Sequence, residues 1–179
     1  STGVIPFLKV VDAEMLAFSQ GVTRRGSYAA YLDISHPEVE EFLDVRKPTG
    51  GDVNRKSTNL HHGVLLSDEF MELIEKATKI EGFDDSWDLV DPHSGEIKKT
   101  VSAKTLWVKL IQNRVETGKP YIMFKDTVQE AVPEFQQNLG LTVHHSNLCS
   151  EITLATDKDR TAVCCLSSVN LEEYDEWKD

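Results

Sequence analysis

Short apolar runs alternate along this chain with segments of helical periodicity, and this order restricts the fold more than any other feature. The apolar runs that predict strands are 28–34 (YAAYLDI), 59–67 (NLHHGVLLS) and 120–126 (PYIMFKD), the last suited to burial on both faces. The segments that predict helices are 4–19, 35–47, 68–79 and 102–118. Because strands that alternate with helices pair in parallel through crossover connections, the order predicts an α/β fold with parallel strands.

Several of the predicted helix ends carry capping residues. Ser35 is followed three residues later by Glu38, which is the spacing of a reciprocal capping box and predicts a helix start. Ser67 or Asp68 is expected to cap the helix over 68–79. Gly118 stands where a left-handed residue would end the helix over 102–118.

The remaining segments predict less regular structure. Residues 80–100 are expected to form a surface loop or a small hairpin around 92–95. Residues 127–140 favour a weaker helix that breaks near Pro133. In the segment 19–27 (SQGVTRRGS) two glycines bracket two arginines, which predicts a flexible basic loop.

Length and charge limit the classes of function. A chain of 179 residues suits one domain with one core. The net charge of -11 argues against an extended surface that binds nucleic acid, although a single nucleotide needs only a few local donors. No apolar run is long enough for a membrane span and no signal peptide is evident, so a cytoplasmic location without membrane contact is expected. The chain begins at Ser1, which leaves open that it is a piece of something longer.

The stretch HSNLCSEI, residues 145–152, carries the strongest chemical pattern. If it is extended, the side-chain period of two places Asn147, Cys149 and Glu151 on one face. A carboxylate can act as a base, an amide can orient a substrate and a thiol can react. These three groups together are suited to adjacent hydroxyls on a sugar.

The same stretch resembles a known family. SNLCSEI, followed by CCLSSVNL at 164–171, resembles the active-site stretch of the large catalytic subunit of ribonucleotide reductase. SQGVTRRG, YLDISHPEVEEFLDVRK and GKPYIMFKD resemble that family in the same order, so the resemblance covers most of the chain. It implies part of the ten-stranded α/β barrel of that subunit. Residues 1–179 would then be a single domain that is a fragment of a larger catalytic barrel.

The resemblance also implies roles for single residues. Cys149 would become the thiyl radical that removes the hydrogen at the 3′ carbon of the ribose. Glu151 would take the proton of the 3′ hydroxyl, and Asn147 would hydrogen-bond to the ribose hydroxyls, with Ser146 beside them as a substrate-binding residue. Cys164 resembles one of the two cysteines whose oxidation supplies the reducing equivalents.

The basic loop resembles the family's specificity loop, which links an effector nucleotide to the choice of base. Gln20 and either Arg24 or Arg25 are the expected contacts with ATP or a deoxynucleoside triphosphate. The choice between the two arginines depends on where a one-residue gap is placed. Cys165 stands where the family requires no cysteine, which leaves open whether it or Cys164 takes the reducing role.

The resemblance implies several partners and no cofactor or metal bound directly by this chain. The substrate would be a ribonucleotide, taken as a diphosphate. The radical would come from a metal-containing small subunit or, as the alternative, from adenosylcobalamin, and electrons would come from thioredoxin or glutaredoxin. The remaining portions of the large subunit and a second copy, forming a homodimer, would complete the enzyme.

Parts of the family pattern are missing, and two other readings compete with the enzyme. No cysteine precedes Cys149, and the substrate-phosphate loop, the radical-relay tyrosines and the carboxyl-terminal cysteines would lie beyond Asp179. The isolated chain is therefore predicted to be inactive. One alternative is a catalytically incomplete nucleotide-binding or scaffold protein that retains the fold. A zinc site is another alternative, but the spacing of its possible ligands is poor; these are His144, His145, Cys149, Cys164 and Cys165.

Overall fold

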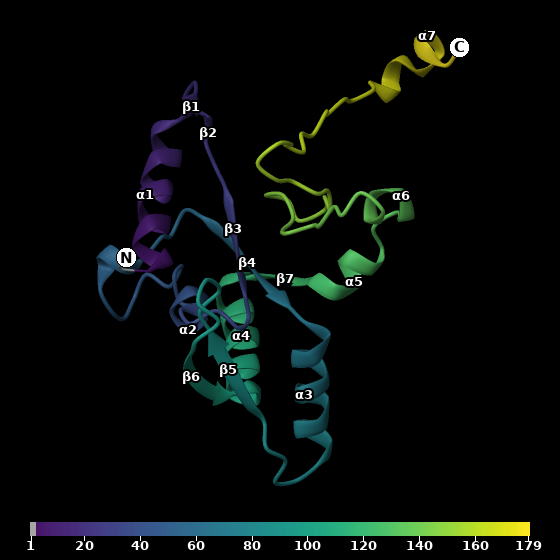
Figure 1. Ribbon diagram of the computed structural model, residues 1–179. Coiled ribbons are helices and arrows are strands. Elements are labelled where there is room, and N and C mark those ends of the chain that lie inside the picture. The colour runs from purple at the N-terminus through teal and green to yellow at the C-terminus, as the bar shows by residue number, and fades with distance from the viewer. Residues whose placement is uncertain (1–2) are drawn as a thin grey trace.

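Three parallel strands and the helices that follow them form the centre of the molecule. The computed structural model describes residues 3–179, apart from the side chains of Ser19 and Gln20. The strands β3 (Ala29–Asp33), β4 (His61–Leu66) and β7 (Tyr121–Phe124) pair in the order β3-β4-β7 (Figure 1). The helices α2 (Val39–Leu43), α3 (Asp68–Lys79) and α4 (Ala103–Thr117) stand between successive strands. The predicted α/β fold with parallel strands is confirmed.

The other elements are short or lie at the edges of this unit. They are α1 (Val4–Ala17), β1 (Ser19–Gln20), β2 (Arg24–Arg25), the 3-10 helix η1 (Val53–Arg55), β5 (Ser86–Val90) and β6 (Ile97–Ser102). Toward the C-terminus follow α5 (Lys125–Glu130), α6 (Glu134–Gln137), the 3-10 helix η2 (Leu171–Glu173) and α7 (Tyr174–Trp177). The sheet does not close into a barrel within the described residues.

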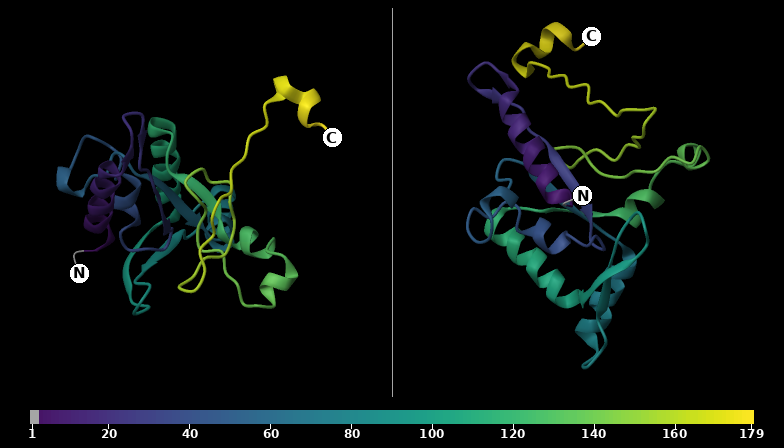
Figure 2. Two further views of the ribbon diagram at one scale, coloured as in Figure 1. Left: turned by 90° about the horizontal axis from the view of Figure 1, so that it is seen from above. Right: turned by 60° about the vertical axis from the view of Figure 1, so that its left-hand side comes forward.

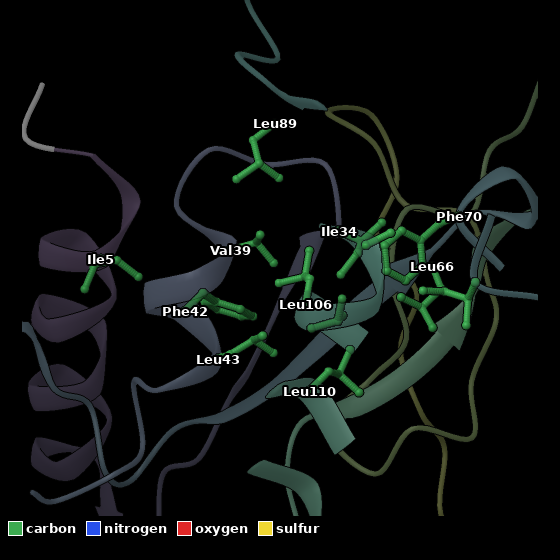
Figure 3. Packing of buried hydrophobic residues seen from close by; sticks show 13 residues of the cluster. Ile5, Ile34, Val39, Phe42, Leu43, Leu66, Phe70, Leu89, Leu106 and Leu110 are labelled. Atoms are coloured by element: carbon green, nitrogen blue, oxygen red, sulfur yellow. The ribbon is translucent and has the colours of Figure 1, made fainter. Parts of the chain in front are cut away.

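Alternate residues of the strands face two different apolar clusters, as the period of two requires. One face packs against α2, α3 and α4 and forms the larger core, which Figure 3 shows from close by. Its strand residues include Ala30, Leu32, Val64, Leu66 and Ile122. The opposite face packs against the chain that follows β7. Its cluster consists of Tyr31, Leu65, Met123, Val128, Val132 and Val143.

The predicted caps of two helices are confirmed. The Ser67 hydroxyl accepts a hydrogen bond from the backbone N–H of Phe70 and caps α3. Ser102 caps α4 in the same way. Gly118 ends α4 with a φ of 71°, in the left-handed region that favours glycine.

The predicted capping box at Ser35 is wrong. The helix α2 begins only at Val39, and the Ser35 hydroxyl donates to the Asp33 carboxylate at 2.7 Å instead of capping a helix. Glu38 is also engaged elsewhere, because its carboxylate accepts a hydrogen bond of 2.7 Å from the backbone N–H of Val4, at the start of α1. Both residues therefore join neighbouring elements rather than each other.

The structure also settles three segments for which the sequence predicted a loop or hairpin, a weak helix and a strand. Residues 80–100 contain the antiparallel hairpin of β5 and β6, and its Leu89 is fully buried in the core, so the hairpin is more than a surface feature. The helix over 127–140 breaks near Pro133, as predicted, into α5 and α6. The strand at 120–126 packs on both faces, with Ile122 against the larger core and Met123 in the second cluster, although Phe124 at its end is exposed.

The basic segment 19–27 forms a short hairpin rather than an open loop. Ser19 pairs with Arg25 and Gln20 with Arg24 in antiparallel register. The backbone N–H of Gly26 donates to the carbonyl oxygen of Phe18 at 2.6 Å and closes the hairpin. A Cβ at Gly26 would lie 2.7 Å from the carbonyl oxygen of Met15, so a side chain does not fit there. The hairpin stands at the far end of α1, away from α2 and α4 (Figure 1).

The chain contains little regular secondary structure after α6. Between Asn138 and Asn170 it contains no helix and only an isolated bridge, between Asp157 and Arg160. Figure 2 shows this part as an extended path that leaves the body of the protein and ends in α7.

Candidate active site

The segment 145–152 is folded into a turn, and the prediction that it is extended is wrong. The backbone N–H of Ser150 donates to the carbonyl oxygen of Asn147, and Ser150 has a φ of 67°. The Asn147 side-chain oxygen accepts two further bonds, each 3.1 Å long, from the backbone N–H groups of Glu151 and Ile152. An asparagine that binds the backbone ahead of it favours a turn over a strand.

Tyr31 on β3 holds this turn against the sheet. Its hydroxyl donates to the carbonyl oxygen of Asn147 at 3.2 Å, and its ring stacks on His145 with ring centroids 6.1 Å apart. Gly63, beside it on β4, makes room for the ring, because a Cβ at Gly63 would lie 2.4 Å from a Tyr31 ring atom. A glycine inside a strand often marks such a close approach.

A second anchor fixes the chain before the turn. The Gln129 side chain on α5 accepts a bond from the backbone N–H of Val143 and donates one to the carbonyl oxygen of Leu141. Val143 itself is buried against Met123 of β7. Strand, helix and turn are therefore joined on the face of the sheet opposite the larger core.

A cavity of about 420 Å³ lies where the turn meets the later segment 162–166. Its walls are His145, Ser146, Asn147, Glu151, Ile152, Leu154, Thr156, Ala162, Val163, Cys164, Cys165 and Leu166. The structure thus brings together Ser146, Asn147, Glu151 and Cys164 of the predicted site. Cys149 is not in this lining; it is exposed at the turn between Asn147 and Ser150.

The groups in the cavity differ in how far their hydrogen-bonding capacity is used. The Asn147 oxygen is occupied by backbone donors, whereas its amide nitrogen makes no hydrogen bond with any described residue. The Ser146 hydroxyl donates to the carbonyl oxygen of Ile152 at 2.7 Å and can still accept. Glu151 is exposed. One amide donor, one hydroxyl acceptor and one carboxylate therefore remain for a bound polar molecule.

An ion pair on the sheet joins β3 to the element after β7. The Lys125 ammonium at the start of α5 contacts the Asp33 carboxylate at the end of β3. Burial opposes ionisation of Asp33, but the hydrogen bonds from Lys125 and Ser35 outweigh it, so the pKa of the carboxyl is lowered.

The other predicted site residues lie outside the cavity. Arg24 and Arg25 are exposed on the hairpin of β1 and β2 and project to opposite faces of it, as neighbours in a strand do. The side chain of Gln20 lies outside the described residues. Within residues 3–179 no group of three His, Cys, Asp or Glu side chains is placed to hold a metal ion.

Sequence reasoning missed Tyr31 and Gly63. Both carried a signal. Tyr31 is the large polar-tipped residue on the face of β3 opposite Ala30 and Leu32, and Gly63 interrupts an otherwise apolar strand. The partner of Tyr31 lies 116 positions away in the chain, so only the fold reveals the contact.

The family follows from a match along nearly the whole chain. A family model described as "Ribonucleotide reductase, barrel domain" matches residues 1–178. The chain belongs to the ribonucleotide reductase barrel family. The resemblance first carried by SNLCSEI and the preceding motifs is thereby confirmed, and the three parallel strands are a part of that family's α/β barrel.

Relatives with this ribonucleotide reductase domain occur in viruses and in cells. A protein of Frog virus 3 (isolate Goorha), provisionally named a ribonucleoside-diphosphate reductase large subunit, is 54% identical over 179 residues, which are all of this chain and 30% of the relative. The ribonucleoside-diphosphate reductase large subunit of Invertebrate iridescent virus 3 is 44% identical over 99% of this chain and 35% of its own length. That of Caenorhabditis elegans is 36% identical over 97% of this chain and 24% of its own.

A solved structure gives the same result for the fold. The alpha subunit of the Actinobacillus ureae class Id ribonucleotide reductase superposes with a TM-score of 0.71 at 34% identity, over all of this chain and 28% of the subunit. The chain thus spans about a third or less of the length of these relatives. None of the helices among the described residues combines the length and apolar composition needed to cross a membrane.

Proposed function

We propose that this chain forms the centre of the substrate site of a ribonucleoside-diphosphate reductase large subunit. One observation carries the proposal: Asn147, Glu151 and Cys164 come from two separate segments and line one cavity, in a chain of the ribonucleotide reductase family. The names of the viral and cellular relatives support a ribonucleoside diphosphate as the substrate.

In this proposal each group has one task. Cys149 lies at the turn beside the cavity and not in its lining. In this proposal its thiyl radical reaches the hydrogen atom at C3′ of the ribose, removes it and becomes a thiol again. The Glu151 carboxylate takes the proton of the 3′ hydroxyl, a task that suits an ionised carboxylate. The Asn147 amide nitrogen donates to a ribose hydroxyl, since its oxygen already holds the turn. Ser146 accepts a hydrogen bond from the substrate beside it.

Cys164 supplies one of the two thiols that are oxidised as the ribose is reduced. The second thiol belongs to the remaining portion of the large subunit, and thioredoxin or glutaredoxin restores the pair. The radical comes from a metal-containing small subunit, with adenosylcobalamin as the alternative source. On the hairpin of β1 and β2, Gln20 and one of Arg24 and Arg25 contact the effector nucleotide.

Residues 1–179 are, in this proposal, one part of a single larger catalytic domain. The short reach of the chain along its relatives supports this reading. The isolated chain is expected to form no deoxyribonucleotide, because the second reducing thiol and the radical source lie elsewhere. In the assembled enzyme the large subunit is expected to be a homodimer.

The decisive test uses the complete large subunit that contains this chain, together with its radical-generating small subunit. Formation of deoxyribonucleoside diphosphate is measured for the wild type, for Cys149→Ala and for Cys165→Ser. The Cys149→Ala variant is expected to lose all activity, because no other described group is assigned the hydrogen-atom step. Cys165→Ser removes the adjacent thiol from the cavity wall, so retained activity assigns the reducing role to Cys164 and lost activity assigns it to Cys165.

Activity of Cys149→Ala near the wild-type level would remove Cys149 from the mechanism. An inactive wild-type enzyme that still binds nucleotides would instead support the alternative of a nucleotide-binding or scaffold protein. Deoxyribonucleotide formation by the isolated 179-residue chain would overturn the view that it is one part of the catalytic unit.

A further inference from the structure

Two adjacent thiols stand in the wall of the cavity, and the proposed function uses only one of them. Cys164 and Cys165 are both exposed free cysteines, and both line the cavity beside Asn147 and Glu151. In an extended chain neighbouring side chains project to opposite sides, so the two thiols meet only where the backbone between them can turn. The role of Cys164 alone does not explain a second thiol in this wall.

The backbone around the pair is not fixed by secondary structure. Among the described residues, the chain from 161 to 169 makes no backbone–backbone hydrogen bond and contains no helix or strand. Figure 1 shows it as part of the extended path toward α7. No hydrogen-bonded ladder has to break for the two thiols to turn toward each other.

The geometry of neighbouring residues decides what kind of disulfide could form. Consecutive Cα atoms lie about 3.8 Å apart, closer than the roughly 4.4 to 6.8 Å usual for bridged cysteines. A disulfide between them is therefore strained. Strained and exposed disulfides have higher reduction potentials than structural ones, which makes them easy to reduce again.

We propose that Cys164 and Cys165 are a site of reversible oxidative modification, at which a peroxide converts the two thiols into a disulfide between adjacent residues. The thiolate of one cysteine attacks the O–O bond of hydrogen peroxide, which gives a sulfenic acid and one water. The other thiol then attacks the sulfenic sulfur, so that the S–S bond forms and a second water leaves. Two electrons pass from sulfur to peroxide, and a dithiol reductant returns them.

The modification would withdraw the Cys164 thiol from the cavity wall. The inference depends only on the two thiols and their surroundings, so it stands or falls independently of ribonucleotide reduction. Its consequence for that reaction would be a reversible block, because a closed pair has no thiol left to donate electrons to a substrate.

Peptide mapping can identify the disulfide, because tryptic cleavage separates Cys149 from the pair Cys164 and Cys165. Trypsin cleaves after Lys158 and Arg160, so Cys149 falls in one peptide and the pair in another, 161–178. The purified protein is treated with hydrogen peroxide, alkylated and digested. The peptide 161–178 is expected to carry no alkyl group and to be lighter by the mass of two hydrogen atoms. Reduction with dithiothreitol before alkylation should restore two alkylated thiols.

Two variants separate this disulfide from the other pairings. Cys165→Ser should lose the change in peptide 161–178, whereas the matched control Cys149→Ser should keep it. A cross-linked peptide that joins Cys149 to Cys164 would overturn the proposal. So would a wild-type peptide 161–178 in which both thiols are still alkylated after peroxide, or are oxidised separately to sulfinic or sulfonic acids.

Discussion

The region before α6 and the region after it differ in how much regular secondary structure and buried core they contain. The first contains the sheet, the capped helices and a core in which residues such as Phe70 are fully buried. The second has almost no regular structure, and apolar residues such as Leu166, with 92% of its surface exposed, point into solvent. All three cysteines and the polar wall of the cavity lie in the second region.

This difference separates the part of the chain that contributes most of the buried core from the part that carries the candidate site. The first region contains the larger buried core, whereas the second is held to the sheet by a few anchors, chiefly Tyr31 and Gln129. Under the proposed function, the exposed apolar side chains of the second region would contact the remaining portions of the large subunit. The residues proposed to react would then be carried by a segment whose conformation depends on contacts from outside it.

The largest contrast is expected from truncating one apolar side chain in each region. Phe70 packs its ring edge to face with Trp87, with centroids 5.1 Å apart, and Phe70→Ala should lower the free energy of unfolding by about 3 to 5 kcal/mol. Leu166→Ala should change it by less than about 0.5 kcal/mol. Urea denaturation measures both, and equal effects would remove the distinction between the regions.

The pH dependence of stability should report on the first region through His62. Burial, with the charge of Arg46 adding to it, lowers the pKa of His62 to about 3, against 6.5 for an exposed imidazole. Between these values the unfolded chain binds a proton that the folded protein excludes, so stability falls as the pH drops below 6.5. His62→Leu should reduce the loss between pH 6.5 and 4.5 by about 2 to 3 kcal/mol.

Denaturation curves recorded at several pH values test this expectation for His62. His93 is exposed, and His93→Leu is the control that should keep the wild-type slope. If the free energy of unfolding of His62→Leu falls with decreasing pH as steeply as that of the wild type, other groups dominate the acid sensitivity.

The join between the regions can be disturbed at Gly63. The added Cβ of Gly63→Ala would overlap the Tyr31 ring, and the displacement should cost about 1 to 3 kcal/mol. The cost should largely vanish in a Tyr31→Ala background, where the ring is absent. Thermal or urea unfolding of the two single variants and the double variant forms the cycle, and additive effects would show that the ring is not what Gly63 accommodates.

The smallest effect is expected from removing one hydroxyl. Tyr31→Phe loses the hydrogen bond to the carbonyl oxygen of Asn147, which should cost about 0.5 to 1.5 kcal/mol. Amide hydrogen exchange should become faster at Glu151 and Ile152, whose N–H groups the Asn147 side chain holds, while β4 stays protected. If the exchange rates at Glu151 and Ile152 are the same in Tyr31→Phe and in the wild type, Tyr31 does not anchor the turn.

The features that could be predicted from the sequence are those set by contacts between residues close together in the chain. The caps at Ser67 and Gly118 use partners within four residues, so the sequence alone identified them. Ser35 also stands at the start of a predicted helix, but its hydroxyl donates to the Asp33 carboxylate and caps no helix.

The sequence predicted part of the composition of the cavity wall, since Ser146, Asn147, Glu151 and Cys164 line it and Cys149 does not, but it did not predict the shape of the site. The family motif identified Asn147 and Glu151, which do share a cavity, but the assumed pleat failed because Asn147 binds the backbone ahead of it. The contact with Tyr31 spans most of the chain, and no local pattern encodes it. The catalytic roles of these residues stay predictions.

The contact between Glu38 and the first turn of α1 has a mechanical consequence. Besides the backbone N–H of Val4, the Glu38 carboxylate faces the guanidinium of Arg55 at 3.7 Å, so the base of the helix is clamped there. With 14 residues, α1 is about 21 Å long, and the basic hairpin stands at its other end. The Tyr28 hydroxyl also donates to the carbonyl oxygen of Leu8, and the Asn59 amide donates to the Asp12 carboxylate, so the helix is held along its length. Because a tilt of about 10° over that length would move the hairpin by about 4 Å, these contacts together set where the hairpin stands.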